Sequence, residues 1–258
     1  MNEVLVLYKP QGVTPLQLIE KFREDNPEYK DEKIGFAGRL DPLAHGVMLL
    51  TIGEANKHRE PLLSLNKTYK FSVLLGVETD TYDYLGIIKS PTILEVPEDY
   101  KVKVEDFIRR HSGKYTQPYP PFSSKTINGT PLFKLAKRGR IKNYESRIKG
   151  GTWPVKEVEI FRFELYKDQT VKTSEITEII LRNLKKIKGF FRQNRIIRQW
   201  MKFFEENPNR MFKLLSFEID CSSGTYVRSL AHELGQELGT GAIAFEINRT
   251  RVGDYIVE

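Results

Sequence analysis

The chain has 258 residues, of which 40% are hydrophobic, and this is enough to bury the core of one large domain or two small ones. A single cysteine excludes an internal disulfide framework, and four scattered histidines lack the spacing of zinc ligands, so we expect no metal site. The opening apolar run at residues 4–8 is too short for a signal peptide or a membrane span, which predicts a cytoplasmic protein.

Apolar periodicity along the chain predicts a mixed succession of strands and helices. Residues 4–8 are expected to form a buried strand. Thr14 has the character of a helix N-cap, and Leu16 and Ile19 should lie on the buried face of the helix that follows. Alternation in residues 69–75 places every second side chain on one face of a strand. The remaining predicted strands span residues 47–52, 155–166, 211–220 and 242–250, and the remaining helices span residues 104–112, 131–138 and 226–238.

A loop rich in special backbone residues follows the first predicted helix. Its sequence, GFAGRLDPLAHG, spans residues 35–46 and contains three glycines, with Pro42 directly after Asp41. Glycines permit tight turns and the close approach of another backbone, and a proline restricts the residue before it. Asp41 is therefore expected in a shaped loop and not on a helix face. On this stretch alone, an aspartate that merely starts a turn is the simpler interpretation.

Positive charge is concentrated in one stretch, which we call the basic segment (residues 172–210). It carries ten Lys or Arg residues against four Glu, a local charge of +6 in a chain whose net charge is +7. It divides at Gly189 into two helical patterns, of which the second is amphipathic. The expected apolar face holds Phe190, Ile196, Ile197, Trp200, Met201, Phe203 and Phe204, and the expected basic face holds Arg192, Arg195, Arg198 and Lys202. Charge this localised favours a polyanionic partner, RNA more than a membrane.

A series of short motifs runs in order along the chain. They are KPQGVT (9–14), GRLDPLAHGV (38–47), GEANK (53–57), KTYK (67–70), TDTYDYLG (79–86), PPFSSK (120–125), GTPLF (129–133), CSSGTYVRSL (221–230) and NRTRVG (248–253). In this order they resemble the TruB-type pseudouridine synthases, which convert a uridine in the T-loop of tRNA to pseudouridine. The resemblance implies an α+β (mixed α/β) protein with the pseudouridine synthase fold, a central, largely antiparallel sheet flanked by helices.

The resemblance also implies catalytic roles. Asp41 matches the family's catalytic aspartate, which breaks the N-glycosidic bond so that uracil can rotate and rejoin through C5. Arg228 would pair with Asp41 and hold it ionised and oriented. Tyr69 would stack on the flipped uracil and help to remove the C5 proton. Attack at C1′, attack at the base C6 and proton abstraction at C2′ all need an ionised aspartate, and the sequence does not choose among them.

Five further motif positions are expected to bind the substrate: Lys9, Phe36, Asp83, Tyr226 and Ile247. Ordinary core packing is the alternative for Tyr226, and equally for the catalytic candidate Tyr69. Phe36 departs from the family, which has a histidine there that fills the space beneath the extruded base. A phenyl ring can still stack, but it cannot supply the hydrogen bonds of an imidazole.

Two departures concern how RNA is held. Family members usually carry a small RNA-binding domain after the last motif, whereas this chain ends at Glu258, so we expect one catalytic domain at residues 1–258 without a C-terminal PUA-type domain. The basic segment has no counterpart in the family pattern. We expect it to be an insertion that grips tRNA phosphates through its basic face, in a monomer that needs no cofactor.

The favoured interpretation is an enzyme that isomerises a tRNA uridine, at position 55 in the T-loop if it follows its family. An alternative is a catalytically inactive tRNA-binding or tRNA-folding protein on the same scaffold. Asp41, Tyr69 and Arg228 argue against that alternative, and Phe36 and the missing domain argue weakly for it. A glycoside hydrolase would need a second carboxylate beside Asp41, and the sequence nominates none.

Overall fold

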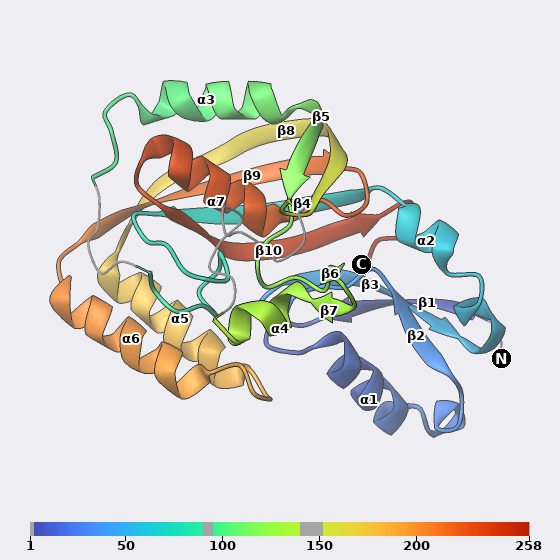
Figure 1. Ribbon diagram of the computed structural model, residues 1–258. Helices are drawn as coiled ribbons and strands as arrows, with labels where there is room; N and C mark the ends of the chain where they lie inside the picture. Colours follow the sequence, from blue (N-terminus) through green and yellow to red (C-terminus); the bar gives the residue numbers. More distant parts are fainter. Residues whose placement is uncertain (1–2, 90–94, 140–151, 258) are drawn as a thin grey trace.

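The computed structural model describes residues 3–89, 95–139 and 152–257, and one eight-stranded sheet runs through them (Figure 1). Its strands are β1 (Glu3–Lys9), β2 (Ile34–Ala37), β3 (His45–Ile52), β4 (Lys67–Leu75), β5 (Gly113–Pro118), β8 (Val155–Lys172), β9 (Met211–Cys221) and β10 (Ala242–Val252). They lie in the order β1-β3-β10-β4-β9-β8-β5, and β2 pairs with β3. Only the short contact between β10 and β3 is parallel, which confirms the predicted, largely antiparallel sheet.

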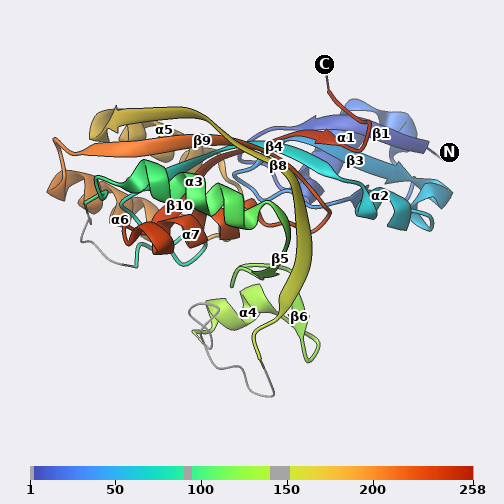
Figure 2. The same cartoon turned by 90° about the horizontal axis from the view of Figure 1, so that it is seen from above.

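The helices are α1 (Pro15–Asp25), α2 (Glu60–Ser64), α3 (Tyr100–His111), α4 (Leu132–Lys137), α5 (Thr173–Lys186), α6 (Gln193–Glu206) and α7 (Val227–Leu238). Most of the helices flank this sheet, with α3 and α7 on one face and α5 and α6 on the other. A two-stranded ribbon of β6 (Thr126–Ile127) and β7 (Thr130–Pro131) precedes α4. Figure 2 shows β8 curving away from the main sheet toward α4 and β6, so this part of the chain projects from the body.

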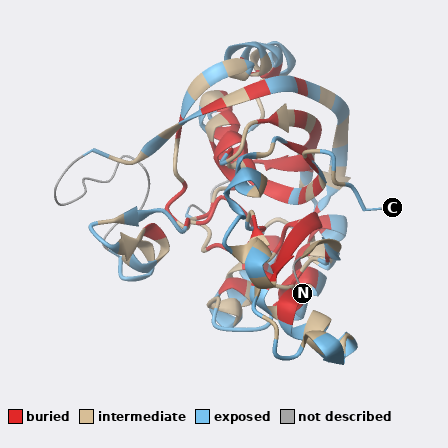
Figure 3. Ribbon diagram, turned by 90° about the vertical axis from the view of Figure 1, so that its right-hand side faces the viewer, coloured by how far each residue is buried: buried red, intermediate tan, exposed pale blue. Residues whose placement is uncertain are grey.

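Alternation along β4 decides which helices cover which face. Tyr69, Phe71 and Val73 belong to a core cluster shared with α7 and α3, as the period of two predicted. Leu74, which points the other way, belongs to a second cluster shared with α5 and α6. The central strands are therefore buried on both faces, whereas the outer helices keep exposed surfaces (Figure 3).

The first strand and the first helix each differ from the sequence prediction. β1 is half-buried along most of its length, because it lies at the edge of the sheet and pairs only with β3. Thr14 caps α1 through a capping box with Gln17, as predicted. The buried face of α1 carries Leu18 and Ile19, however, and Leu16 is 65% exposed. Ile19 is therefore placed as predicted, whereas the prediction for Leu16 is wrong, because the buried face continues through Leu18.

The basic segment forms the helical hairpin α5–α6, as its two patterns predicted. Trp200 is fully buried between α6 and the sheet. Phe190 lies before α6 and is 98% exposed, so the prediction that it joins the apolar face is wrong. The physical reason is the left-handed backbone of Arg192, with φ of 66°, which separates Phe190 from the helix that begins at Gln193. Met201, also expected on that face, is 46% exposed.

Candidate active site

The loop that carries Asp41 lies where two strands meet along β3. β2 pairs with the second half of β3, and β10 pairs with its first two residues. The loop connects β2 to β3 and crosses the seam between β2 and β10. At Gly46 φ is 110°, and a Cβ there would lie 2.2 Å from the carbonyl oxygen of Arg249. Only glycine lets β10 approach this closely.

Arg249 fixes the loop from within the protein. Its side chain is 1% exposed, and its guanidinium donates to the carbonyl oxygens of Val47 at 2.9 Å, Gly38 at 3.3 Å and Arg39 at 3.5 Å. These carbonyl groups flank the turn that presents Asp41. Sequence reasoning assigned Arg249 no role, and the signal that could have found it is an arginine within a motif on a strand that is otherwise buried.

Asp41 and Arg228 form an ion pair across 187 residues of sequence. Nε of Arg228 donates to Oδ2 of Asp41 at 2.7 Å. The arginine side chain is 3% exposed, and that of the aspartate is 34% exposed. The cation therefore lies behind the carboxylate, and the carboxylate faces open space. The structure thus brings together the two residues that sequence reasoning expected to pair.

Three further oxygens surround Arg228. Its Nη1 donates to the carbonyl oxygen of Thr81 at 2.6 Å, its Nη2 donates to that of Phe122 at 3.2 Å, and Oδ2 of Asp83 lies 3.8 Å from its Nε. Burial alone would lower the pKa of Arg228, but the negative charges of Asp41 and Asp83 have a larger, opposite effect. The pKa of Arg228 is therefore raised above its ordinary value. The guanidinium therefore stays charged, and it is held in one plane by groups from three segments.

Asp83 is more buried than a typical substrate ligand. The Thr81 hydroxyl donates to its Oδ1 at 2.5 Å, and the backbone N–H of Leu85 donates to the same atom at 3.0 Å. Burial raises the pKa of Asp83 to about 6, against the opposing effect of Arg228. The side chain lines the pocket but is only 8% exposed, so most of its partners lie within the protein.

A pocket of about 820 Å³ opens in front of Asp41, within the usual size range of small-ligand sites. It gathers most of the residues that sequence reasoning nominated. Asp41, Tyr69, Arg228, Phe36, Asp83, Tyr226, Ile247 and Arg192 all line it. The pocket is also lined by residues to which the sequence assigned no role, among them Arg249, Phe122 and Ser123.

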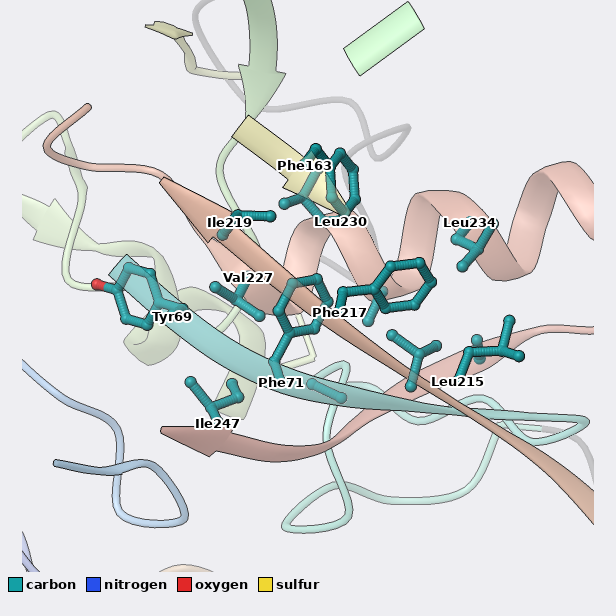
Figure 4. Packing of buried hydrophobic residues seen from close by; sticks show 14 of the residues in the cluster. Tyr69, Phe71, Phe163, Leu215, Phe217, Ile219, Val227, Leu230, Leu234 and Ile247 are labelled. Atoms are coloured by element: carbon teal, nitrogen blue, oxygen red, sulfur yellow. The ribbon is translucent and has the colours of Figure 1, made fainter. Parts of the chain in front are cut away.

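Tyr69 ends the apolar row of β4. In Figure 4 its ring lies at the edge of the cluster that contains Phe71, and its hydroxyl points away from that cluster. The residue is 9% exposed, and burial raises the pKa of its phenol while Arg249 opposes the rise. The hydroxyl therefore keeps its proton at neutral pH. Tyr69 belongs both to the core and to the pocket wall, so the two interpretations of this residue are compatible.

Tyr226 is fixed at the start of α7. Its backbone N–H donates to Oε1 of Gln117 at 2.7 Å, and its ring meets the Tyr119 ring edge-on at 5.5 Å. Burial raises the pKa of the Tyr226 phenol to about 12. The Tyr226 ring thus forms a fixed part of the pocket wall, directly before the helix that carries Arg228.

Lys9 does not line the pocket. Its side chain is fully buried, and its Nζ donates to the carbonyl oxygens of Pro10 at 3.0 Å and Val13 at 2.6 Å. Burial lowers the pKa of Lys9 to about 8. In the same turn, Gly12 donates its N–H to the carbonyl oxygen of Pro42 at 2.8 Å. The expected direct contact with substrate does not fit this position, and Lys9 instead stiffens a turn that supports the Asp41 loop.

The structure separates Arg192 from the rest of the basic face. Arg192 lines the pocket and pairs with Asp80. The other three basic residues, Arg195, Arg198 and Lys202, are exposed on α6 and do not line the pocket. The four residues expected to share one role therefore divide into two groups.

Phe36 lies on β2 and lines the pocket, with the guanidinium carbon of Arg39 5.7 Å from its ring centroid. We expect Phe36→Ala to weaken RNA binding or single-turnover conversion by about 1 to 3 kcal/mol, the contribution of one base–aromatic stack. Single-turnover rates measured at several enzyme concentrations separate an effect on RNA affinity from an effect on the rate at saturation. Phe36→His, which restores the family residue, is the matched variant, and unchanged kinetics in Phe36→Ala would remove this residue from the site.

No set of three or more His, Cys, Asp or Glu side chains is arranged to hold a metal ion within residues 3–89, 95–139 and 152–257. In the same described ranges, no helix is long and apolar enough to cross a membrane. The chemistry that the site can offer is that of a carboxylate backed by a fixed cation, which can act as a nucleophile or as a general base.

Solved structures share this fold. A chain in the crystal structure of a Cbf5-Nop10-Gar1 complex matches 99% of this chain over 50% of its own length, with a TM-score of 0.56 and 20% identity. A chain in the structure of an H/ACA RNP bound to a substrate RNA containing 2'-deoxyuridine matches 99% of this chain over 49% of its own length, with a TM-score of 0.53 and 19% identity. At these identities the likeness concerns the fold alone.

Curated relatives described as tRNA pseudouridine synthase B match nearly the whole chain. The relative from Thermosipho melanesiensis is 30% identical over 255 residues, which cover 99% of this chain and 65% of the relative. The relatives from Aquifex aeolicus and Blochmanniella pennsylvanica are 30% and 31% identical and are covered over 71% and 76% of their lengths, with 100% and 99% of this chain aligned. The chain thus spans about two thirds to three quarters of these relatives.

A family model matches as well, and it covers more than half of the sequence. It describes the N-terminal domain of the TruB family of pseudouridylate synthases and matches residues 27–179, a range that contains Asp41, Tyr69 and Asp83. The relatives and the family model agree with the resemblance that the ordered motifs indicated. The chain belongs to the TruB family of pseudouridylate synthases.

Proposed function

We propose that the protein converts a uridine of tRNA to pseudouridine, at position 55 in the T-loop if it follows its family. The observation that carries the proposal is the Asp41–Arg228 pair, in which a carboxylate with 34% exposure faces an 820 Å³ pocket while its cation is buried. The curated relatives, described as tRNA pseudouridine synthase B, support tRNA as the substrate.

The proposed reaction exchanges one bond to uracil for another. The C1′–N1 bond breaks, the base rotates, the C1′–C5 bond forms, and the proton lost from C5 is balanced by one gained at N1. The product is an isomer, so no electrons are transferred. An ionised Asp41 can act at C1′, at C6 or on the C2′ proton, and in each route Arg228 holds its carboxylate toward the substrate.

The aromatic lining of the pocket suits an extruded base. Removing a uridine from its stack costs a few kcal/mol, which protein contacts have to offset. Tyr69, Tyr226 and Phe36 offer ring surfaces, and stacking on such a ring contributes about 1 to 3 kcal/mol per base. Burial raises the pKa of the Tyr69 phenol, so it keeps its proton at neutral pH and is a poor base. We therefore propose stacking on the base as its main role and removal of the C5 proton as a secondary one. Phe190, 98% exposed at the pocket rim, adds one more ring surface.

The proposal is tested by incubating the protein with an unmodified tRNA transcript and mapping pseudouridine along it. We expect one modified position in the T-loop and none in a transcript in which that uridine is replaced by cytidine. Tight binding without product on any tRNA would favour the inactive tRNA-binding or tRNA-folding protein instead.

We further propose that residues 1–258 act as one catalytic domain and that the exposed part of the basic segment binds tRNA phosphates. Arg195, Arg198 and Lys202 point to solvent on α6, so phosphates can reach them. Deleting the segment would not test this role, because its helices bury Ile180 and Trp200 against the sheet, and the deletion would expose that core.

A charge-neutral variant tests the same role without that damage. We expect Arg195→Gln/Arg198→Gln/Lys202→Gln to make the plot of log affinity against log salt less steep by about 2, since each lost phosphate contact reduces the size of the negative slope by roughly 0.7 to 0.9. The single-turnover rate at saturating tRNA should not change. Lys101→Gln/Arg109→Gln removes exposed charge from α3, which packs on the other face of the sheet, and is the control. A slope equal to that of the unchanged protein would contradict phosphate binding by α6.

A further inference from the structure

Arg192 makes a two-point ion pair with the motif loop at residues 79–86. Its Nη1 donates to Oδ2 of Asp80 at 2.6 Å, and its Nη2 donates to Oδ1 at 3.1 Å. The two side chains are 28% and 24% exposed, so water screens this pair less than a fully exposed one. The same Asp80 oxygen that meets Nη2 also accepts the backbone N–H of Ile87 at 2.7 Å. The arginine is thereby tied to both ends of the loop.

The same guanidinium lies over a second loop. Its central carbon is 4.8 Å from the ring centroid of Phe122, a cation–π contact. Both loops hold Arg228, since the carbonyl oxygens of Phe122 and of Thr81, the neighbour of Asp80, accept its Nη2 and Nη1. Arg192 therefore connects the two segments that supply the backbone acceptors of the arginine behind Asp41.

Arg192 is itself rigidly placed. It precedes α6 with φ of 66°, and the side chain of the next residue, Gln193, accepts the N–H of Phe191 at 2.9 Å and donates to the carbonyl oxygen of Ile187 at 3.3 Å. Further along α6, Nε1 of the buried Trp200 donates to a backbone oxygen of the same motif loop, at Tyr84, at 3.0 Å. The turn at Arg192 and α6 thus hold the motif loop at residues 79–86 together.

The basic segment is also linked to the first motif and to the Asp41 loop. Asn183 on α5 donates to the Tyr84 hydroxyl at 3.1 Å, and Gln11 from the first motif donates to the same oxygen at 2.9 Å. Leu43, two residues after Asp41, packs in the core cluster that the segment forms with the sheet. Three motif loops therefore contact the helical hairpin directly, and the first motif is linked to it through Tyr84.

We propose that Arg192 is a positioning residue, which clamps the loops at Asp80 and Phe122 so that Arg228 and Asp41 keep their reactive geometry. This inference rests on the proposed function and assigns Arg192 a role other than binding phosphate. The charge of this guanidinium is already paired with a carboxylate, which also takes two of its five N–H groups, so it attracts an RNA phosphate less than an unpaired arginine does. Arg195, which is exposed in the first turn of α6, offers the contrast three residues further along the chain.

The test compares Arg192→Met with Arg195→Met in single-turnover reactions and in tRNA binding at several salt concentrations. For Arg192→Met we expect a roughly ten- to hundredfold slower rate at saturating tRNA, with affinity and salt slope unchanged, because a small displacement of reacting groups is enough for such a loss. Arg195→Met should instead lower tRNA affinity and make that affinity less dependent on salt.

Lower affinity with an unchanged rate in Arg192→Met would overturn the clamp in favour of a phosphate contact. If Arg192→Met does not fold, Arg192→Lys takes its place under the same criteria, since lysine keeps the charge but cannot form the two-point pair. Exchange of the Arg228 Nε–H with water, followed by NMR, needs no activity. It should accelerate about tenfold in the variant, and an unchanged exchange rate would overturn the clamp even if the wild type forms no pseudouridine.

Discussion

Asp41→Asn is expected to slow pseudouridine formation by about 10³-fold or more under single-turnover conditions, while tRNA still binds. The amide has nearly the same shape as the carboxylate, and its oxygen can still accept from Nε of Arg228, at the 2.7 Å seen for Oδ2. What it lacks is the negative charge that all three candidate routes need. The measurement is product per enzyme after rapid mixing with unmodified tRNA.

Two controls make that result specific to the site. Asp106→Asn changes an exposed aspartate on α3 and should leave the rate unchanged. Equal tRNA affinity in Asp41→Asn and in the unchanged protein would show that the loss concerns chemistry and not recognition. Product formed by Asp41→Asn at the normal rate would end the catalytic assignment.

Arg228→Met is expected to impair stability and catalysis together. It leaves the buried carboxylate of Asp83 without the cation 3.8 Å away, and losing one partner of a buried pair costs about 3 to 5 kcal/mol of unfolding free energy. It also removes the donor that orients Asp41, so the rate should fall by about 10²-fold or more. Denaturant unfolding and single-turnover kinetics on the same preparation measure both effects.

A second substitution separates the two effects. In Arg228→Met/Asp83→Asn the buried position no longer has to ionise, so we expect part of the lost stability to return. The rate should stay low, because Asp41 still has no guanidinium behind it. Recovery of activity along with stability would mean that Arg228 matters only for folding.

Local patterns along the sequence were sufficient to predict the strands and helices with strong periodicity. β4 shows this best, since Tyr69, Phe71 and Val73 share the predicted face. Leu16 and Met201 were assigned to the wrong face of regular helices, and another error concerns a position where the backbone departs from regular geometry. Phe190 falls off the apolar face of α6 because Arg192 adopts a left-handed conformation that no periodicity reveals.

The site was predictable only as far as the ordered motifs reach. The motifs predicted that Asp41, Tyr69 and Arg228 belong to one site, and in the structure all three line one pocket. The supporting contacts are of another kind. Arg249 reaches the Asp41 loop through a strand pairing, and Asp80 meets its arginine across 112 residues, so neither follows from local spacing.

The seam at which β10 meets β3 also governs when the protein can become active during its synthesis. β10 fills the centre of the sheet, between β3 and β4, and its Arg249 is 202 residues from Val47 in sequence. A nascent chain that lacks β10 has neither a continuous sheet nor the guanidinium that holds the carbonyl groups around Asp41. Such long-range closure is slow compared with helix formation. A chain whose synthesis has not reached β10 therefore lacks the contacts that hold the Asp41 loop.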